Sequence, residues 1–182
     1  MGRPLPHGTQ DAELATVQGV QVALLSRVEG ECVTYVWKNL LISVWAGEAT
    51  LTGLAIYEQH VRPTFERYPQ GVSTINIIVP GKYSFPNADA RREFQRFVQQ
   101  YAAQTATTLI VLPGTGFMSS ALRGVITALA LASPRGGPKM HVVESTRDAA
   151  EWLPAMHSER TGVAISADEL LTLLEIIKST IT

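Results

Sequence analysis

The stretch Val72-Ser-Thr-Ile-Asn-Ile-Ile-Val79 is almost continuously apolar, and a second run of the same kind, Thr108-Leu-Ile-Val-Leu112, follows it. Runs of this length without polar alternation are typical of strands that are covered on both faces of a parallel sheet. Between them, Asn87 is suited to cap a helix, and apolar residues recur at the i, i+3, i+4 and i+7 positions from Phe94 to Tyr101. A strand, a helix and a strand in this order predict a parallel βαβ unit.

Further strands are expected on the N-terminal side of this unit. Cys32–Trp37 and Leu40–Trp45 are rich in β-branched and aromatic residues and predict a hairpin that turns at Lys38-Asn39. Val20–Val28 predicts one more short strand. The hairpin would therefore add an antiparallel edge to the parallel sheet.

Helical periodicity separates the remaining strands. Residues 48–66 follow a helical period, although Pro63 is expected to kink or end that helix early. After the loop Pro113-Gly114-Thr115-Gly116, an apolar helix is expected over about Met118–Leu131, and Lys139–Val143 predicts another strand. Each predicted strand after the hairpin is thus followed by a helix.

Two capping patterns predict the last helices. Ser145 precedes Asp148 by three residues and caps a short helix, while Ser166 and Glu169 form a capping box that opens a final helix to about Ser179. The pattern as a whole predicts an α/β fold: a mostly parallel sheet with an initial antiparallel hairpin, helices packed on it, and an extra C-terminal helix.

The expected organisation has three parts. Residues 1–12 are expected to be a flexible tail, residues 13–160 a single α/β domain, and residues 161–182 a C-terminal helical extension.

Composition restricts the function classes. The chain has 182 residues, 46% of them hydrophobic and 17% charged, and its net charge is −1. This balance leaves no overall basic footprint for nucleic acid or for an anionic membrane. Cys32 is the single cysteine, residues 1–10 lack the apolar core of a signal peptide, and no apolar run is long enough for a membrane span. A cytoplasmic protein is therefore expected.

From about residue 30 to residue 157, the element order resembles that of STAS-like (SpoIIAA-like) domains, which include the anti-sigma factor antagonists. The resemblance is sharpest where Thr108–Leu112 is followed by Gly116-Phe-Met-Ser-Ser-Ala-Leu-Arg-Gly-Val-Ile126, which is similar to the strand, Asp-Ser-Ser-Gly-Leu motif and apolar helix of those antagonists. Asn39–Gly47 and Ala149–Leu153 also resemble segments of bacterial STAS/SEC14-type proteins.

The resemblance implies a non-catalytic protein-interaction or regulatory module whose partner is a regulatory kinase or another signalling protein. In that family the first serine of the motif is phosphorylated, which would make Ser119 the acceptor, or Ser120 in an alternative register. Met118 replaces the aspartate of the family and Ala121 its glycine. A purely structural role for the serines as helix caps stays open beside the phosphorylation switch.

In open α/β sheets, the loops after the strand carboxyl ends form the functional rim. Here these loops carry aromatic side chains and a lysine, which are suitable anchors for a protein partner. The alternative is that Phe85 and Phe117 fold back onto the core. The predicted partner-binding residues are Lys82, Tyr83, Phe85, Gly114, Thr115, Gly116, Phe117, Ser119 and Ser120.

A small-molecule binding protein, for a nucleotide or a lipid, is the alternative function. Gly114-Thr115-Gly116 lies between a strand and a helix, as in dinucleotide-binding folds, and Glu144 ends the next strand. The third glycine position is Ser119, however, and no Walker lysine follows. The loop from Gly114 to Ser120 would be the ligand site, with no cofactor indicated by a complete motif.

Enzymatic function finds little support in the sequence. Ser119 or Ser120 could pair with His141 and Asp148, but the chain has no Gly-x-Ser-x-Gly elbow, and His141 is expected to be a hydrogen-bonded structural histidine. The histidines are also scattered, without the short spacings of metal ligands.

The final helix is apolar on more than one side. A helix of this kind is either sandwiched within its chain or buries one side against another subunit, and a homodimer through this helix is expected. The residues concerned are Leu170, Leu171, Leu173, Leu174, Ile176 and Ile177.

Overall fold

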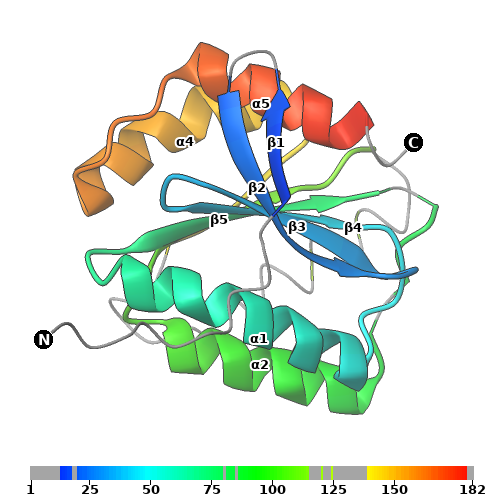
Figure 1. The fold of residues 1–182 in the computed structure, drawn as a ribbon. Helices are drawn as coiled ribbons and strands as arrows, with labels where there is room; N and C mark the ends of the chain where they lie inside the picture. Colours follow the sequence, from blue (N-terminus) through cyan, green and yellow to red (C-terminus); the bar gives the residue numbers. More distant parts are fainter. Residues whose placement is uncertain are drawn as a thin grey trace, which may run out of the picture.

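The computed structural model describes residues 13–17, 20–79, 81–84, 86–114, 120, 124 and 139–179 (Figure 1). It confirms the α/β fold. The strands are β1 (Glu13–Val17), β2 (Val20–Val28), β3 (Cys32–Trp37), β4 (Leu40–Trp45), β5 (Val72–Ile78), β6 (Thr105–Val111) and β7 (Lys139–Val143). The described helices are α1 (Leu51–Arg67), α2 (Ala88–Tyr101), α4 (Thr146–Thr161) and α5 (Ala167–Ser179).

The seven described strands form one sheet in which the spatial order is the sequence order, β1 to β7. Strands β1 to β4 pair antiparallel, and β4 to β7 pair parallel. The predicted hairpin is confirmed as β3 and β4, with Lys38 in the left-handed region at φ 54°. The sequence pattern did not indicate β1, which pairs with β2 as an additional edge strand.

Helices cover both faces of the sheet. Figure 1 shows α1 and α2 on one face and α4 and α5 on the other. Strand β4 explains the arrangement, because all six of its residues are buried. Leu40, Ile42 and Val44 belong to the apolar cluster under α4 and α5, whereas Leu41 and Trp45 belong to the cluster under α1 and α2.

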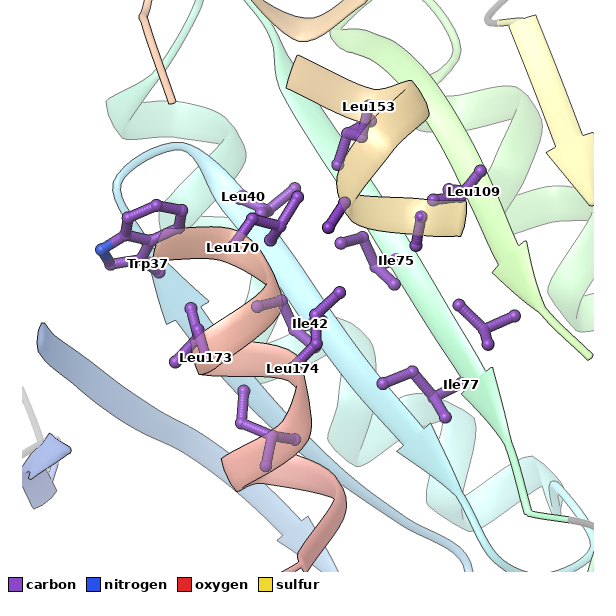
Figure 2. Close-up of a cluster of buried hydrophobic side chains, with 14 of the residues drawn as sticks. Trp37, Leu40, Ile42, Ile75, Ile77, Leu109, Leu153, Leu170, Leu173 and Leu174 are labelled. Carbon is purple, nitrogen blue, oxygen red and sulfur yellow. The ribbon is translucent and has the colours of Figure 1, made fainter. Parts of the chain in front are cut away.

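Helix α5 is part of the core. Leu170, Leu173, Leu174 and Ile177 are at most 2% exposed. Figure 2 shows the three labelled leucines of α5 over β4, next to Trp37 and Ile42. The predicted C-terminal extension thus packs directly on the sheet.

Prolines do not end the helices that contain them. Helix α1 continues past Pro63 to Arg67, so the prediction of an early end is wrong. Pro63 is exposed, whereas Val61 and Phe65 beside it are at most 1% exposed, and their packing holds the helix on the sheet. Helix α4 likewise runs through Pro154 to Thr161 and is longer than expected.

Side-chain caps begin the helices where the sequence indicated them. Asn87 accepts hydrogen bonds from the backbone N–H groups of Asp89 and Ala90, and Ser145 accepts one from Asp148. The N–H of Glu169 donates to Ser166 Oγ at 3.1 Å, which confirms that half of the predicted capping box.

The N-terminus of α1 is occupied by a carboxylate of the same chain. Glu31, in the turn between β2 and β3, accepts hydrogen bonds from the N–H of Thr50 at 3.0 Å and from its hydroxyl at 2.6 Å. A negative charge at this position stabilises the helix. The close approach requires glycine, because a Cβ at Gly47 would overlap the carbonyl of Gly30.

We therefore expect Gly47→Ala to lower the free energy of unfolding by about 2 kcal/mol, since the added methyl group meets backbone that cannot move aside. Gly124→Ala is the matched control: Gly124 is helical and its added Cβ meets no atom, so this change should stabilise by about 0.5–1 kcal/mol. Urea unfolding measures both. Equal effects of the two substitutions would contradict the packing at Gly47.

Candidate functional site

The predicted rim is the edge at which β4 to β7 end. Two backbone hydrogen bonds continue the pairing beyond the strands, from Val79 N to Trp45 O at 2.9 Å and from Leu112 N to Val143 O at 2.9 Å. Because the strands are parallel neighbours, the chain segments that leave their carboxyl ends begin side by side.

The described residues of the predicted site differ in exposure. Lys82, Gly114 and Ser120 are exposed, and Ser120 is helical. Gly114 has φ 95°, a conformation that glycine adopts without strain. Tyr83 is half-buried against the cluster under α1 and α2, and this burial raises the pKa of its hydroxyl. Five residues of the predicted site lie outside the described residues: Phe85, Thr115, Gly116, Phe117 and Ser119. The alternative that Phe85 and Phe117 fold back onto the core therefore stays a prediction.

The rim has a further residue that was not among the predicted partner-binding residues. Leu51, the first residue of α1, exposes 47% of its surface and is the one exposed large apolar side chain in the described part of the chain. It follows the carboxyl end of β4, the strand next to β5. Leu51 and Lys82 therefore lie on the segments that follow two adjacent strands.

The sheet topology does not single out one position along this rim. A binding crevice in an open α/β sheet forms where the strand order reverses and helices diverge to opposite faces. Among the described strands the order never reverses. A ligand crevice of the doubly wound type is therefore not built into the described sheet, and the rim is a surface of neighbouring loops.

His141 does not have the role expected for it. It is exposed on β7, an edge strand of the described sheet, and stacks on Trp152 of α4 with ring centroids 4.4 Å apart and an interplanar angle of 10°. The sequence predicts a hydrogen-bonded structural histidine at this position, whereas the described contact of His141 is this ring stacking at an exposed position. Asp148, which was considered as a partner of His141 in a serine hydrolase site, begins helix α4: its main-chain N–H donates a hydrogen bond to Ser145 Oγ at 3.1 Å.

The buried structural histidine is His157 of α4. Its Nδ1 lies 2.8 Å from Ser73 Oγ and its Nε2 lies 2.9 Å from Asn39 Oδ1. Asn39 Nδ2 in turn donates to the carbonyl oxygen of Gly71 at 2.9 Å. Asn39, Ser73 and His157 are each 0% exposed. We call these three side chains the buried relay.

The hydrogen bonds define the protonation of the ring. Because Asn39 uses its amide N–H toward Gly71, its Oδ1 must accept from His157, so Nε2 carries the proton. Nδ1 is then an acceptor, and the hydroxyl of Ser73 donates to it. The neutral imidazole therefore uses both nitrogens.

A serine that contacts a histidine is also part of the Ser-His-Asp arrangement of nucleophilic catalysis, in which a carboxylate takes the place that Asn39 has here. Here the arrangement is closed, because the serine oxygen has no contact with solvent. The relay also lies at the opposite end of the parallel strands from the rim: Asn39 precedes β4 and Ser73 is the second residue of β5. Its role in this conformation is to join the β3–β4 turn, β5 and α4.

A sequence signal for His157 exists. Ala149, Leu153, His157 and Thr161 are spaced by four residues, and all four are buried. A polar side chain on such an apolar stripe must find a partner in the core. The sequence does not predict which residues His157 binds, because Asn39 and Ser73 are distant in the sequence and look like ordinary turn and strand residues.

We expect His157→Ala to destabilise the protein by about 3 kcal/mol or more, since it leaves a cavity and two buried polar groups without a partner. His141→Ala, at an exposed histidine, should cost less than about 1 kcal/mol. Chemical denaturation of both variants measures the difference. A His157 variant as stable as the His141 variant would refute the structural role of the relay.

Comparisons with known proteins leave the family open: no protein-family model, no curated protein and no solved structure matches this chain. None of the described helices has the length and apolar character needed to cross a membrane. Across the described ranges, no three His, Cys, Asp or Glu side chains are grouped as metal ligands.

Proposed function

We propose that this chain is a non-catalytic, cytoplasmic protein-interaction module of the STAS-like type, and that the rim after β4, β5 and β6 binds its partner. The observation that best supports the proposal is the combination of exposed Leu51 and exposed Lys82 on segments that follow adjacent strands. An exposed apolar side chain and an exposed cation on neighbouring segments at the edge of a sheet are suitable anchors for a protein surface.

Two other residues support the same location. Tyr83 is half-buried on the core, so its ring is held in place next to Lys82. Ser120 is exposed in the chain segment that follows β6, the neighbour of β5. A phosphate on Ser120 would add nearly two negative charges to this rim and would change its affinity for a charged partner.

Site-specific photo-crosslinking tests the proposal in the host cell. A photoreactive phenylalanine at Lys82 should crosslink a protein partner, and one at Gln95, an exposed residue of α2, should not. Leu51→Glu should reduce the yield from position 82 by tenfold or more, while Ala55→Glu, at an exposed residue one turn along α1, leaves it unchanged. Equal yields from positions 82 and 95 would contradict a partner surface at the rim.

The same assay tests the phosphorylation switch. Ser120→Asp should change the crosslinking yield several-fold because of its added charge, whereas Ser158→Asp, at an exposed serine of α4, should not. Intact-mass analysis of protein from the host should find a phosphate on Ser119 or Ser120. If the protein carries no phosphate and Ser120→Asp leaves the crosslinking yield unchanged, the phosphorylation switch is refuted, while the proposal of a partner-binding surface is unaffected.

A small-molecule function remains the second candidate, and the positive φ of Gly114, three residues after the end of β6, favours it. Glycine at such a position lets a ligand approach the main chain. Native mass spectrometry separates the two candidates, because a retained nucleotide or lipid would shift the mass of the intact chain and a protein partner would shift it far more.

We also propose a homodimer through the outer side of α5. Four of its apolar side chains are buried within the chain, which leaves half-buried Leu171 and Ile176 for an interface. Ile176→Glu should then convert a dimer into a monomer in light scattering, while Lys178→Glu, at an exposed residue, should not. A monomeric wild-type chain would refute the dimer.

A further inference from the structure

The layer formed by α4 and α5 is joined to the sheet by polar contacts at the amino ends of the parallel strands. His157 of α4 binds Asn39 and Ser73 in the buried relay. The Nζ of Lys38 donates to the carbonyl of Ala164, between α4 and α5, at 3.2 Å and lies 3.9 Å from the Glu169 carboxylate. The β3–β4 turn thus contacts both helices.

We propose that the buried relay is an acid-sensitive latch: a second proton on the His157 ring opens the contact between the α4–α5 layer and the sheet, while α1 and α2 stay packed on the other face. The proton would arrive at Nδ1, which in the closed state accepts the hydrogen bond of Ser73. Ser73 would then lose its acceptor, and its hydroxyl would have to reorient in a site without solvent.

The surroundings disfavour a charged ring. Burial is the main cause, and the positive charge of Lys38 is the second; together they lower the pKa of His157 to about 4. The other described charges that make contacts at this end are Glu169, which is paired with Lys38, and Arg160, whose guanidinium donates to the carbonyl of Ala106. The Glu169 carboxylate is thus already paired with the Lys38 ammonium group.

The two helix layers differ in what an added proton would break. Helices α4 and α5 are bonded to each other through Thr146 and Glu175, so they can leave the sheet as a unit. In the other layer, the buried carboxylate of Glu58 in α1 binds Arg96 of α2, and apolar side chains pack both helices on the sheet. The histidine of that layer, His60, contacts the carbonyl of Ile56 in its own helix, so this contact does not join α1 to another element.

The direction of the pH effect follows from the lowered pKa. Once α4–α5 open, the ring regains its ordinary pKa near 6.5 and binds a proton that the closed state excludes. The latch is therefore fully closed above pH 6.5 and weakens as the pH falls toward 4. The population of the open state should rise about 10-fold at pH 5.5 and about 100-fold at pH 4.

Hydrogen exchange on the full chain tests the latch. After correction for intrinsic rates, amides of α4 and α5 should lose protection about 10-fold between pH 7.5 and pH 5.5, while those of α1 and α2 keep theirs. His157→Gln cannot take the proton and should abolish this change, whereas His141→Gln should retain it. Parallel loss in both layers, or the same loss in His157→Gln, would overturn the proposal.

The wild-type protein provides a test that does not depend on the folding of a variant. Ring ¹⁵N spectra should show His157 protonated at Nε2 and neutral through pH 5.5 in the closed state. A ring that titrates near its ordinary pKa of 6.5 without any loss of α4–α5 protection would also refute the latch.

Discussion

The hand of the crossover connections is the constraint on which the rest of this structure depends. Parallel strands that follow one another in space as they do in sequence, joined by right-handed crossovers, place their helices on the same face of the sheet. Strands β4, β5 and β6 obey this order, so α1 and α2 must share one face. The opposite face, with Ile42, Ile75 and Leu109, would then be bare. Of the described helices, α4 and α5, which follow β7, cover this face, and α5 is accordingly apolar along most of its length.

This layering separates two ends of the molecule. At the amino ends of the parallel strands, the buried side chains of Asn39, Ser73 and His157 bind one another and join three elements. At the carboxyl ends, Leu51 and Lys82 remain exposed. The amino end therefore holds the fold together, and the carboxyl end is where a partner can reach it. A sheet with no reversal of strand order adds no crevice of its own to this rim.

The buried relay also illustrates how a serine and a histidine can serve different purposes. In a catalytic triad the serine oxygen is open to substrate and a carboxylate orients the histidine, whereas here the serine is enclosed, an amide holds the ring, and the side chains join three elements. Because the site is enclosed, the hydrogen bonds to Ser73 and Asn39 depend on the neutral form of the ring, which accepts one and donates the other. The proximity of Lys38 strengthens this preference, because the turn residue that docks α5 also adds a positive charge beside the ring.

The local elements could be predicted from the sequence, because propensity, spacing and capping act over a few residues. The hairpin at Lys38-Asn39, the apolar strands and the caps at Asn87 and Ser145 are all present. The tertiary structure alone decided which groups the buried His157 binds, since it acquires its partners only when segments distant in the sequence meet. It also decided that α1 continues through Pro63: the helix is held by side chains packed against the sheet, and this packing outweighs the hydrogen bond that proline cannot make.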